Sequence, residues 1–257
     1  MVRKNNLLIP PKFLAKWFQV APKGVLHVGA HLAEEFHLYR DQGFGKTFWV
    51  EAQQELVPKI RKVISSSDDE VYQGAVWSKS GDRMTLQITN NGQSTSLYRL
   101  AEHLAQYPTI LPIEERVVPT IRLDDLIPHE AQFDFVNLDI QGAELEALRG
   151  MGERLKTVKW VYAEVNKRML YEGIPLVDEL DAFLSSHDLH RVATAWTGAG
   201  WGDALYSRGT RSVGGRLLNL LGVMALRLHL LGSPRGVARR LRKRLYGSVD
   251  RLRGFSR

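Results

Sequence analysis

The sequence Phe133-Asp-Phe-Val-Asn-Leu-Asp-Ile-Gln-Gly-Ala-Glu-Leu-Glu-Ala-Leu-Arg-Gly150 decides the fold of this chain. Residues 133–138 are mostly apolar and predict a buried strand, which ends at the carboxylate of Asp139. The chain turns at Gly142, and leucines at helical spacing predict a helix from Ala143 onward. This order of strand, polar turn and helix is the unit from which open α/β sheets build ligand sites. Asp139 therefore either belongs to such a site or caps the following helix, where aspartate is favoured.

Length and composition indicate a globular protein. The chain has 257 residues, which suits one α/β domain with extensions or at most two small domains. There is no cysteine, so disulfides and thiolate metal sites are excluded. Residues 2–11 lack the apolar run of a secretory signal, and no run of 18 apolar residues predicts a membrane-spanning helix. We therefore expect a cytoplasmic protein.

The charge of the chain is unevenly distributed. Residues 209–257 contain twelve basic residues and one acidic residue, a net charge of +11, whereas residues 1–208 have a net charge of −4. A mildly acidic body with a strongly basic tail is typical of a tail that meets an anionic surface, either membrane or nucleic acid.

The tail itself predicts an apolar helix followed by a polybasic segment. Arg216, Asn219 and Arg227 fall on one narrow stripe of a helix whose other positions are mostly leucine, and residues 239–244 are almost all basic. This pattern resembles an interfacial anchor at the inner face of a membrane. The alternative is an oligomerisation helix with a basic arm. Nucleic acid is disfavoured because no aromatic residues interleave with residues 239–244 to stack on bases.

Strands and helices alternate along residues 1–208. This alternation predicts an α/β fold with a doubly wound, mostly parallel sheet and helices on both faces, followed by a basic amphipathic helical tail over residues 209–257. The expected strands cover residues 25–30, 47–52, 70–77, 83–89, 115–123, 133–138, 158–165, 190–196 and 203–207, and the expected helices cover residues 10–20, 32–42, 53–64 and 176–186, with one more from Ala143.

Candidate site residues gather at the carboxyl ends of the predicted strands. Gly29, Glu51, residues 75–77, Asp139 and Glu164 each lie at or just past such an end. Since ligands of these sheets bind at that edge, the convergence predicts a cleft for a nucleoside-containing cofactor. Glu51 follows Gly29 by 22 residues, close to the spacing at which an acidic residue binds ribose hydroxyls. The alternative for Glu51 is a solvated acid at the end of a strand.

Several segments together resemble the FkbM-type methyltransferase family, over roughly residues 7–207. The resemblance implies a class I, S-adenosylmethionine-dependent fold, usually a seven-stranded sheet with one antiparallel strand. It also implies O-methylation of sugar or natural-product hydroxyls, with a small-molecule or glycan acceptor. The segments that carry it are residues 25–35, 49–52, 138–145, 164–166, 170–173 and 200–206, of which Leu-Asp-Ile-Gln-Gly-Ala-Glu is the most specific.

This framework assigns expected roles to particular residues. Asp139 is the first candidate for the base that accepts the proton of an acceptor hydroxyl. Glu164 and His31 are further catalytic candidates, with Glu144 and Asp203 as alternatives. Asp139 could instead bind the cofactor's amino group or, with Glu164, a divalent cation, although metal dependence is not favoured. The residues expected to contact the cofactor are Gly29, Ala30, His31, Glu51, Ala52, Ala75, Val76, Asp139 and Gln141.

The sequence departs from the commonest family pattern at two positions. His27 stands where many members carry Asp, and Ala33 stands where many carry Gly. His27 lies inside a predicted strand and is expected to be a core histidine. These departures leave open a membrane-tethered binding protein with a degenerate cofactor pocket. A third hypothesis is an RNA methyltransferase that places its basic tail on phosphates.

Overall fold

The computed structural model describes residues 7–64, 68–209 and 213–232, with the side chains of 213–218 excepted. Its main sheet has seven strands in the order β3-β2-β1-β7-β8-β10-β9. β10 pairs antiparallel with both β8 and β9, whereas all the other pairs in this sheet are parallel. This confirms the predicted mostly parallel sheet with an antiparallel strand. The strands are β1 (Gly24–Val28), β2 (Lys46–Glu51), β3 (Glu70–Gln73), β7 (Phe135–Leu138), β8 (Trp160–Asn166), β9 (Leu189–Trp196) and β10 (Trp201–Arg208).

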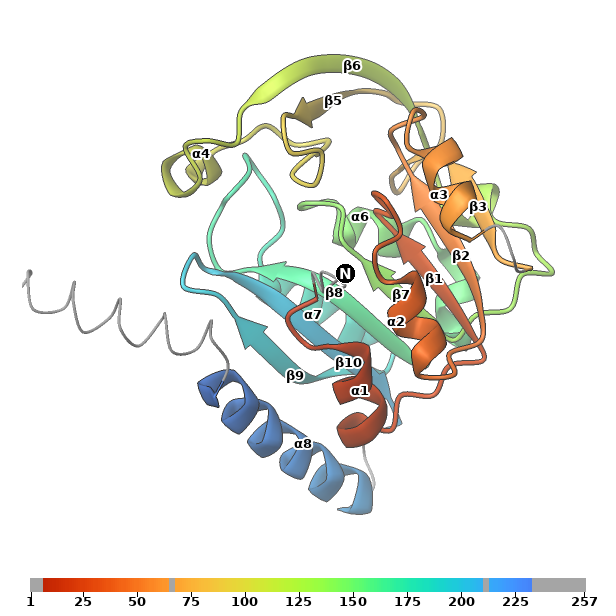
Figure 1. Cartoon of the computed structure of the whole chain (residues 1–257), viewed down its shortest axis with the longest axis vertical. Helices are drawn as coiled ribbons and strands as arrows, with labels where there is room; N and C mark the ends of the chain where they lie inside the picture. The colour runs from red at the N-terminus through yellow and green to blue at the C-terminus, as the bar shows by residue number, and fades with distance from the viewer. Residues whose placement is uncertain (1–6, 65–67, 210–212, 233–257) are drawn as a thin grey trace, which may run out of the picture.

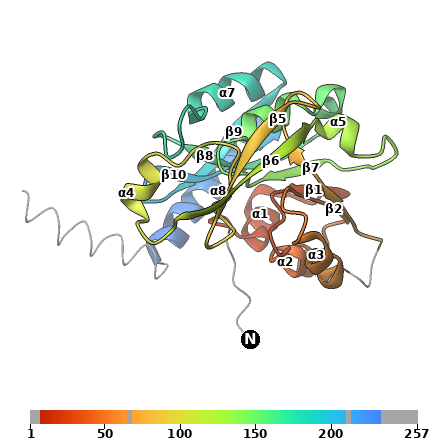
Figure 2. The same ribbon diagram turned by 90° about the horizontal axis from the view of Figure 1, so that it is seen from above.

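Helices cover both faces of this sheet, as the alternation predicted (Figures 1 and 2). On one face, α1 (Pro11–Phe18), α2 (Phe36–Asp41) and α3 (Val57–Val63) bury Leu14, Phe36 and Ile60 against the sheet. On the other, α6 (Glu144–Arg149) and α7 (Val177–Ser186) bury side chains such as Leu148 and Leu184. The two layers of apolar side chains form the core that fixes the positions of the strand ends. The short α5 (Leu123–Leu126) and the 3₁₀ helix η1 (Gly152–Thr157) complete these connections.

A second, three-stranded sheet arches over one edge of the main sheet (Figure 1). It consists of β4 (Ala75–Val76), β5 (Arg83–Thr89) and β6 (Pro112–Ile121), in the order β4-β6-β5. The connection from β5 to β6 carries α4 (Glu102–Gln106). This sheet accounts for one difference from expectation, because the single strand predicted over residues 70–77 is divided between the two sheets at Gly74. A side chain there would collide with Ile121 of β6, so glycine lets the two sheets meet.

The helix predicted over residues 32–42 is shorter than expected. It begins at Phe36 because His31 and Ala33 have positive φ angles of 44° and 53°, which a right-handed helix does not allow. The residues between β1 and α2 therefore form an irregular loop at the carboxyl end of β1. This loop, residues 29–35, carries the polar side chains of His31, Glu34 and Glu35 at the carboxyl end of β1.

The tail begins with a long helix, α8 (Val213–Gly232), that packs on the body of the protein. Leu226 is buried against the core layer that contains α1, and the ring of His229 lies 5.4 Å from the ring of Phe13. Gly222 permits this contact, because a side chain there would meet the ring of Phe18. No helix of the described chain is both long and apolar enough to cross a bilayer. The predicted basic segment 239–244 and the side chain of Arg216 lie outside the described residues, and the division of the chain at residue 208 stays a prediction.

Candidate active site

Two adjoining cavities lie at the carboxyl ends of the central strands. The large cavity has a volume of about 410 Å³ and the small cavity about 60 Å³. Gly29, His31, Gln93 and Asp139 line both, so these residues mark the junction. Every residue expected to contact a cofactor lines one of the two cavities, as does Glu164. The structure therefore brings the predicted site residues together, while their individual roles stay predictions.

Gly29 brings the ends of β1 and β7 into direct contact. Its φ angle is +87°, and a Cβ atom at this position would lie 1.9 Å from the backbone oxygen of Asp139. The N–H groups of Gly29 and Ala30 both donate to the backbone oxygen of Val50, at 3.0 Å each. The loop 29–35 thus leaves β1 in a sharp turn and passes close to Asp139. Such close approach of two backbones requires glycine.

Glu51 is held at the small cavity by two backbone hydrogen bonds. One carboxyl oxygen accepts from His31 N at 2.7 Å, and the other accepts from Gln53 N at 2.8 Å. Burial raises the pKa of Glu51, which is 5% exposed. The remaining walls of the small cavity are largely apolar and include Ala75, Val76, Leu86 and Ile140. An acid fixed beside apolar walls has the chemistry to contact a nucleoside, whose ribose hydroxyls would donate to Glu51.

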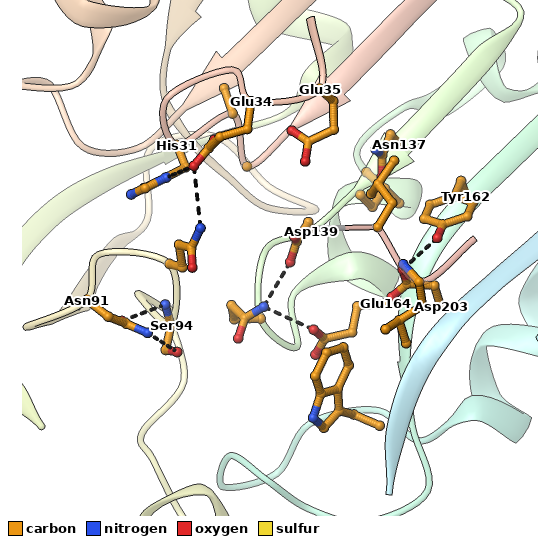
Figure 3. A pocket seen from close by; sticks show the side chains of 18 of the residues that line it. His31, Glu34, Glu35, Asn91, Ser94, Asn137, Asp139, Tyr162, Glu164 and Asp203 are labelled. Atoms are coloured by element: carbon orange, nitrogen blue, oxygen red, sulfur yellow. Dashed lines mark hydrogen bonds and ion pairs between the residues drawn. The ribbon is translucent and has the colours of Figure 1, made fainter. Parts of the chain in front are cut away.

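Asp139 and Glu164 are joined by the side-chain amide of Gln141 (Figure 3). Gln141 Nε2 donates to Asp139 Oδ1 at 2.8 Å and to Glu164 Oε2 at 3.1 Å. On its other side, Gln141 Oε1 accepts from the hydroxyl of Tyr171 at 2.6 Å. Gln141 has a φ angle of +55°, and its backbone oxygen accepts from Ser96 Oγ at 2.7 Å. These contacts fix the amide, which in turn fixes both carboxylates.

The two carboxyl groups differ in how readily they ionise. Burial raises the pKa of Asp139, although the hydrogen bond from Gln141 opposes that shift. Burial and then the charge of Asp139 raise the pKa of Glu164 much further above its ordinary value. Asp139 of this pair therefore loses its proton more readily than Glu164. This makes Asp139 the better proton acceptor of the two.

Asp139 does not cap the helix that follows it. The residue at the N-cap position of α6 is Ala143, and no side chain caps the helix there. Instead, the carboxylate of Glu144 turns back and accepts from Ile140 N at 3.0 Å and from Gly142 N at 3.0 Å. Glu144 is thereby committed to the backbone of the turn, and it does not line either cavity. This arrangement removes Glu144 as an alternative base and leaves Asp139 facing the junction.

His27 and His31 differ in their surroundings, as expected from the sequence. His27 is 1% exposed, stacks on Trp49 with ring centroids 4.6 Å apart, and hydrogen-bonds the hydroxyl of Tyr39. Burial lowers the pKa of His27 to about 3, so this core histidine is neutral. His27 borders only the large cavity, whereas His31 lines both cavities, and the Nδ1 of His31 lies 2.8 Å from Glu34 Oε1. Asp203, another alternative base, lines the large cavity but accepts from Tyr162 OH at 2.5 Å and Leu8 N at 2.7 Å.

The large cavity also has polar and aromatic walls that sequence reasoning missed. Glu35 and Asn137 lie near Asp139 in Figure 3, and His103, Tyr107 and Trp201 close the cavity elsewhere. The sequence predicts Glu35 to lie in the helix over residues 32–42 and Asn137 to lie in the buried strand over residues 133–138. Trp201 Nε1 donates to Tyr107 OH at 2.9 Å, which joins β10 to the segment after α4 across 94 positions of sequence. No local pattern signals such a contact.

The burial of Glu35 should make the stability of the ligand-free protein depend on pH. Burial raises the pKa of Glu35 to about 8 from an ordinary value of 4.5. The unfolded chain thus loses this proton near pH 4.5 and the folded protein near pH 8, so the stabilisation is complete below 4.5 and is lost as pH rises through 8. We expect Glu35→Gln to match the wild type at pH 4.5 and to exceed its free energy of unfolding at pH 8.5, by up to roughly 4 kcal/mol. Urea unfolding at several pH values measures the free energy of unfolding of both proteins. A constant difference between the wild type and Glu35→Gln at all pH values would contradict the prediction.

No group of three or more potential metal ligands occurs within residues 7–64, 68–209 and 213–232. The amide of Gln141 lies between the two carboxylates that were considered as cation ligands. An amide N–H at this position is a hydrogen-bond donor, and it occupies the place between the two carboxylates that a bridging cation would take.

Comparison with known proteins places the chain in a family. Residues 27–190, more than half of the chain, match the family described as Methyltransferase FkbM domain. The 2-O-methyltransferase NoeI of Sinorhizobium fredii (strain NBRC 101917 / NGR234) is 33% identical over 91 residues, which cover 34% of this chain and only 37% of that protein. Ribosomal protein L11 methylase from Lactobacillus delbrueckii subsp. bulgaricus aligns with a TM-score of 0.45 at 9% identity, over 78% of this chain and 76% of that chain. Magnesium protoporphyrin IX methyltransferase from Synechocystis PCC 6803 aligns with a TM-score of 0.44 at 9% identity, over 77% and 75%. The family match confirms the resemblance found in the sequence: this chain belongs to the FkbM methyltransferase family.

Proposed function

We propose that this protein transfers a methyl group from S-adenosylmethionine to a hydroxyl group of a sugar, a glycolipid or a natural product. The observation that carries the proposal is the position of Asp139. This ionisable carboxylate lies at the junction of a small cavity, whose acid and apolar walls suit the groups of a nucleoside, and a large cavity of about 410 Å³ with room for an acceptor. A base at such a junction can accept the proton of an attacking hydroxyl.

The chain's own residues would bind, orient and deprotonate. The bound cofactor supplies an activated methyl group on a sulfonium centre. Glu51 would accept hydrogen bonds from ribose hydroxyls, and Gly29 permits close approach to the backbone. Asp139 would take the acceptor's proton while Gln141 holds it in place. Glu164, whose pKa burial and the charge of Asp139 raise well above its ordinary value, would donate a hydrogen bond or orient the acceptor.

The walls of the large cavity support a sugar-like acceptor. Trp201, Tyr107 and His103 provide aromatic surface, while Asn91, Ser94 and Thr197 bring amide and hydroxyl groups to the same cavity. A sugar ring presents both an apolar C–H face and a rim of hydroxyls, which such a mixed wall can bind. The partial similarity to a 2-O-methyltransferase also favours an oxygen acceptor.

The test is transfer of an isotopically labelled methyl group from S-adenosylmethionine to a panel of acceptors. The panel should contain neutral glycosides, amino-sugar glycosides, a glycolipid extract and bulk RNA. We expect labelled methyl ethers, identified by mass spectrometry, on at least one glycoside or glycolipid. Label on RNA alone would favour the RNA methyltransferase, and failure to bind the cofactor at millimolar concentration would favour a degenerate pocket.

We propose further that α8 and the basic segment after it contact an anionic membrane surface from the cytoplasmic side. One side of α8 packs on the body, and the other exposes apolar side chains. Met224 is 54% and Leu228 is 70% exposed, and Leu220, Leu221 and Leu231 are also exposed. Residues 233–257, which follow α8 in the sequence, contain nine basic residues and one acidic residue. Apolar area beside clustered positive charge is the combination that binds anionic lipid surfaces.

Placing charges on the exposed side of α8 should release the protein from vesicles. We expect the double variant Met224→Glu/Leu228→Glu to lose association with phosphatidylglycerol-containing vesicles by roughly tenfold or more, because each apolar side chain is worth about 1.5–3 kcal/mol when buried. Flotation on a density gradient measures this. The matched control is Ile113→Glu/Val117→Glu, which adds the same charge at exposed apolar positions of β6. Equal flotation of both double variants would contradict the proposal, as would conversion of an oligomer to monomers by the α8 variant alone.

A further inference from the structure

The first residues that the structure describes, Leu7 and Leu8, form part of the wall of the large cavity. Both line the large cavity, and neither lines the small one. Leu7 is buried, whereas Leu8 is half-buried and packs against the core layer that contains α1. Leu8 also precedes residues 27–190, the part of the chain that matches the family. Segments added to a shared fold are where members of a family can differ in specificity, so this wall is a candidate determinant of the acceptor.

A buried pair of side chains holds this segment in place. Asp203 Oδ2 accepts from Leu8 N at 2.7 Å and from Tyr162 OH at 2.5 Å (Figure 3). Tyr162 OH in turn accepts from Ile9 N at 3.1 Å. Both Tyr162 and Asp203 are buried, and hydrogen bonds that are shielded from water are stronger than exposed ones. Two consecutive backbone N–H groups are thereby fixed, and with them the direction of the Leu8 side chain.

The place of this pair in the sheet assigns the wall to the acceptor half of the site. The strand order is β3-β2-β1-β7-β8-β10-β9, and Asp139 directly follows β7. Glu51, the expected ribose ligand, ends β2 on one side of β7, whereas Tyr162 and Asp203 belong to β8 and β10 on the other side. The wall formed by Leu8 therefore lies across Asp139 from the small cavity.

We propose that Leu8, held by Asp203 and Tyr162, determines acceptor specificity and favours an acceptor with an apolar substituent beside the reacting hydroxyl. The inference rests on the proposed function and narrows its acceptor to a compound such as an alkyl glycoside or a glycolipid. Polar side chains of the same cavity would bind the sugar hydroxyls, while contact with Leu8 removes the apolar substituent from water. Asp203 and Tyr162 act through Leu8 and are positioning residues.

Alkyl glycosides of increasing chain length test the preference. The probes are methyl, butyl and octyl glycosides of common hexoses, with a labelled methyl group transferred from S-adenosylmethionine. For the wild type we expect kcat/KM to rise by roughly tenfold or more from methyl to octyl, because each buried methylene group adds to binding. In Leu8→Ala this gain should fall by roughly tenfold, through a higher KM for the octyl glycoside. The affinity for S-adenosylhomocysteine, measured by calorimetry, should stay within about twofold of the wild type.

Two further variants separate specificity from general damage to the fold. Val63→Ala is the matched control, because Val63 is also half-buried against the same core layer but lines neither cavity. It should lower the free energy of unfolding and keep the dependence on chain length. Tyr162→Phe removes one hydrogen-bonding anchor and should lose part of the preference for the octyl glycoside. The double variant Leu8→Ala/Tyr162→Phe should lose no more than Leu8→Ala alone, because Tyr162 acts through Leu8.

Each outcome decides the inference. An unchanged dependence on chain length in Leu8→Ala would overturn it, and additive losses in the double variant would overturn the positioning role of Tyr162. Wild-type protein that methylates glycosides without regard to chain length would overturn the inference and leave the proposed function intact. Wild-type protein that binds S-adenosylhomocysteine but methylates none of these glycosides would overturn the apolar acceptor. Failure of the wild type to bind S-adenosylhomocysteine would instead overturn the proposed function, and this inference with it.

Discussion

Replacing Asp139 with asparagine should reduce methyl transfer by roughly 10²- to 10⁴-fold, the contribution typical of a positioned general base. Asparagine keeps the shape of the side chain and can still accept the hydrogen bond from Gln141 Nε2, so the loop and the fold should be preserved. What is lost is the negative charge and the capacity to take a proton. The measurement is the single-turnover rate with labelled cofactor, combined with S-adenosylhomocysteine affinity by calorimetry.

The binding measurement separates the roles that Asp139 could have. A base affects the rate of the chemical step and leaves cofactor affinity nearly unchanged, whereas a cofactor ligand loses affinity when its charge is removed. Turnover of Asp139→Asn close to that of the wild type would exclude the base. A fall in turnover matched by an equal fall in affinity would assign Asp139 to the cofactor instead.

Glu164→Gln is the matched control, because it changes the other carboxyl group bonded to the same amide. Burial and the charge of Asp139 raise the pKa of Glu164 well above its ordinary value. A glutamine resembles a protonated glutamic acid in shape and charge, so this variant should lose less than about tenfold in rate. The wild-type rate should also fall with decreasing pH, as Asp139 takes up a proton at a pKa raised by burial. A larger loss in Glu164→Gln than in Asp139→Asn would reverse the two roles.

The sheet and the first set of site residues could be predicted because they depend on local patterns. Apolar runs that end in a glycine or an acid, at Gly29, Glu51 and Asp139, mark the carboxyl ends of parallel strands, and these ends meet at one edge. The antiparallel strand of the sheet, β10, agrees with what the family resemblance implied. The positions of Gly29, Glu51 and Asp139 could be predicted because the apolar runs that fix them are adjacent in the sequence.

Residues whose roles depend on contacts between distant segments could not be predicted. Glu144 appeared to be a candidate base, but its carboxylate is used by the backbone N–H groups of the turn that precedes it. Glu35 was placed in a helix because the positive φ angles of His31 and Ala33 leave no mark in the periodicity. The exposed side of α8 was visible as an apolar pattern, but the sequence could not show which side packs against α1.

Replacing Gly29 with alanine should have the largest effect on stability of any single change at the site. The added Cβ atom would lie 1.9 Å from the backbone oxygen of Asp139, at a φ angle of +87° that alanine rarely adopts. The obstacle is backbone in a central strand pair, which cannot rotate away as a flexible side chain would. We expect the free energy of unfolding to fall by roughly 3 kcal/mol or more. Folded protein that remains should bind S-adenosylhomocysteine poorly, because the end of β7 must move away from the end of β1.

Gly43 provides a control that separates conformational strain from the collision. It also has a positive φ angle, +69°, but it is exposed and no atom lies within 4 Å of a Cβ built there. Gly43→Ala should therefore cost only the strain of a left-handed conformation, about 1–2 kcal/mol, and leave cofactor affinity unchanged. Urea unfolding gives the loss in free energy of unfolding for each variant. The difference between the two losses is the cost of the collision between the ends of β1 and β7. Equal destabilisation by the two substitutions would mean that the backbones at the ends of β1 and β7 can move apart at little cost. The position of Asp139 would then have to depend on its hydrogen bonds, from its own N–H to Val28 O and from Gln141 Nε2 to its carboxylate.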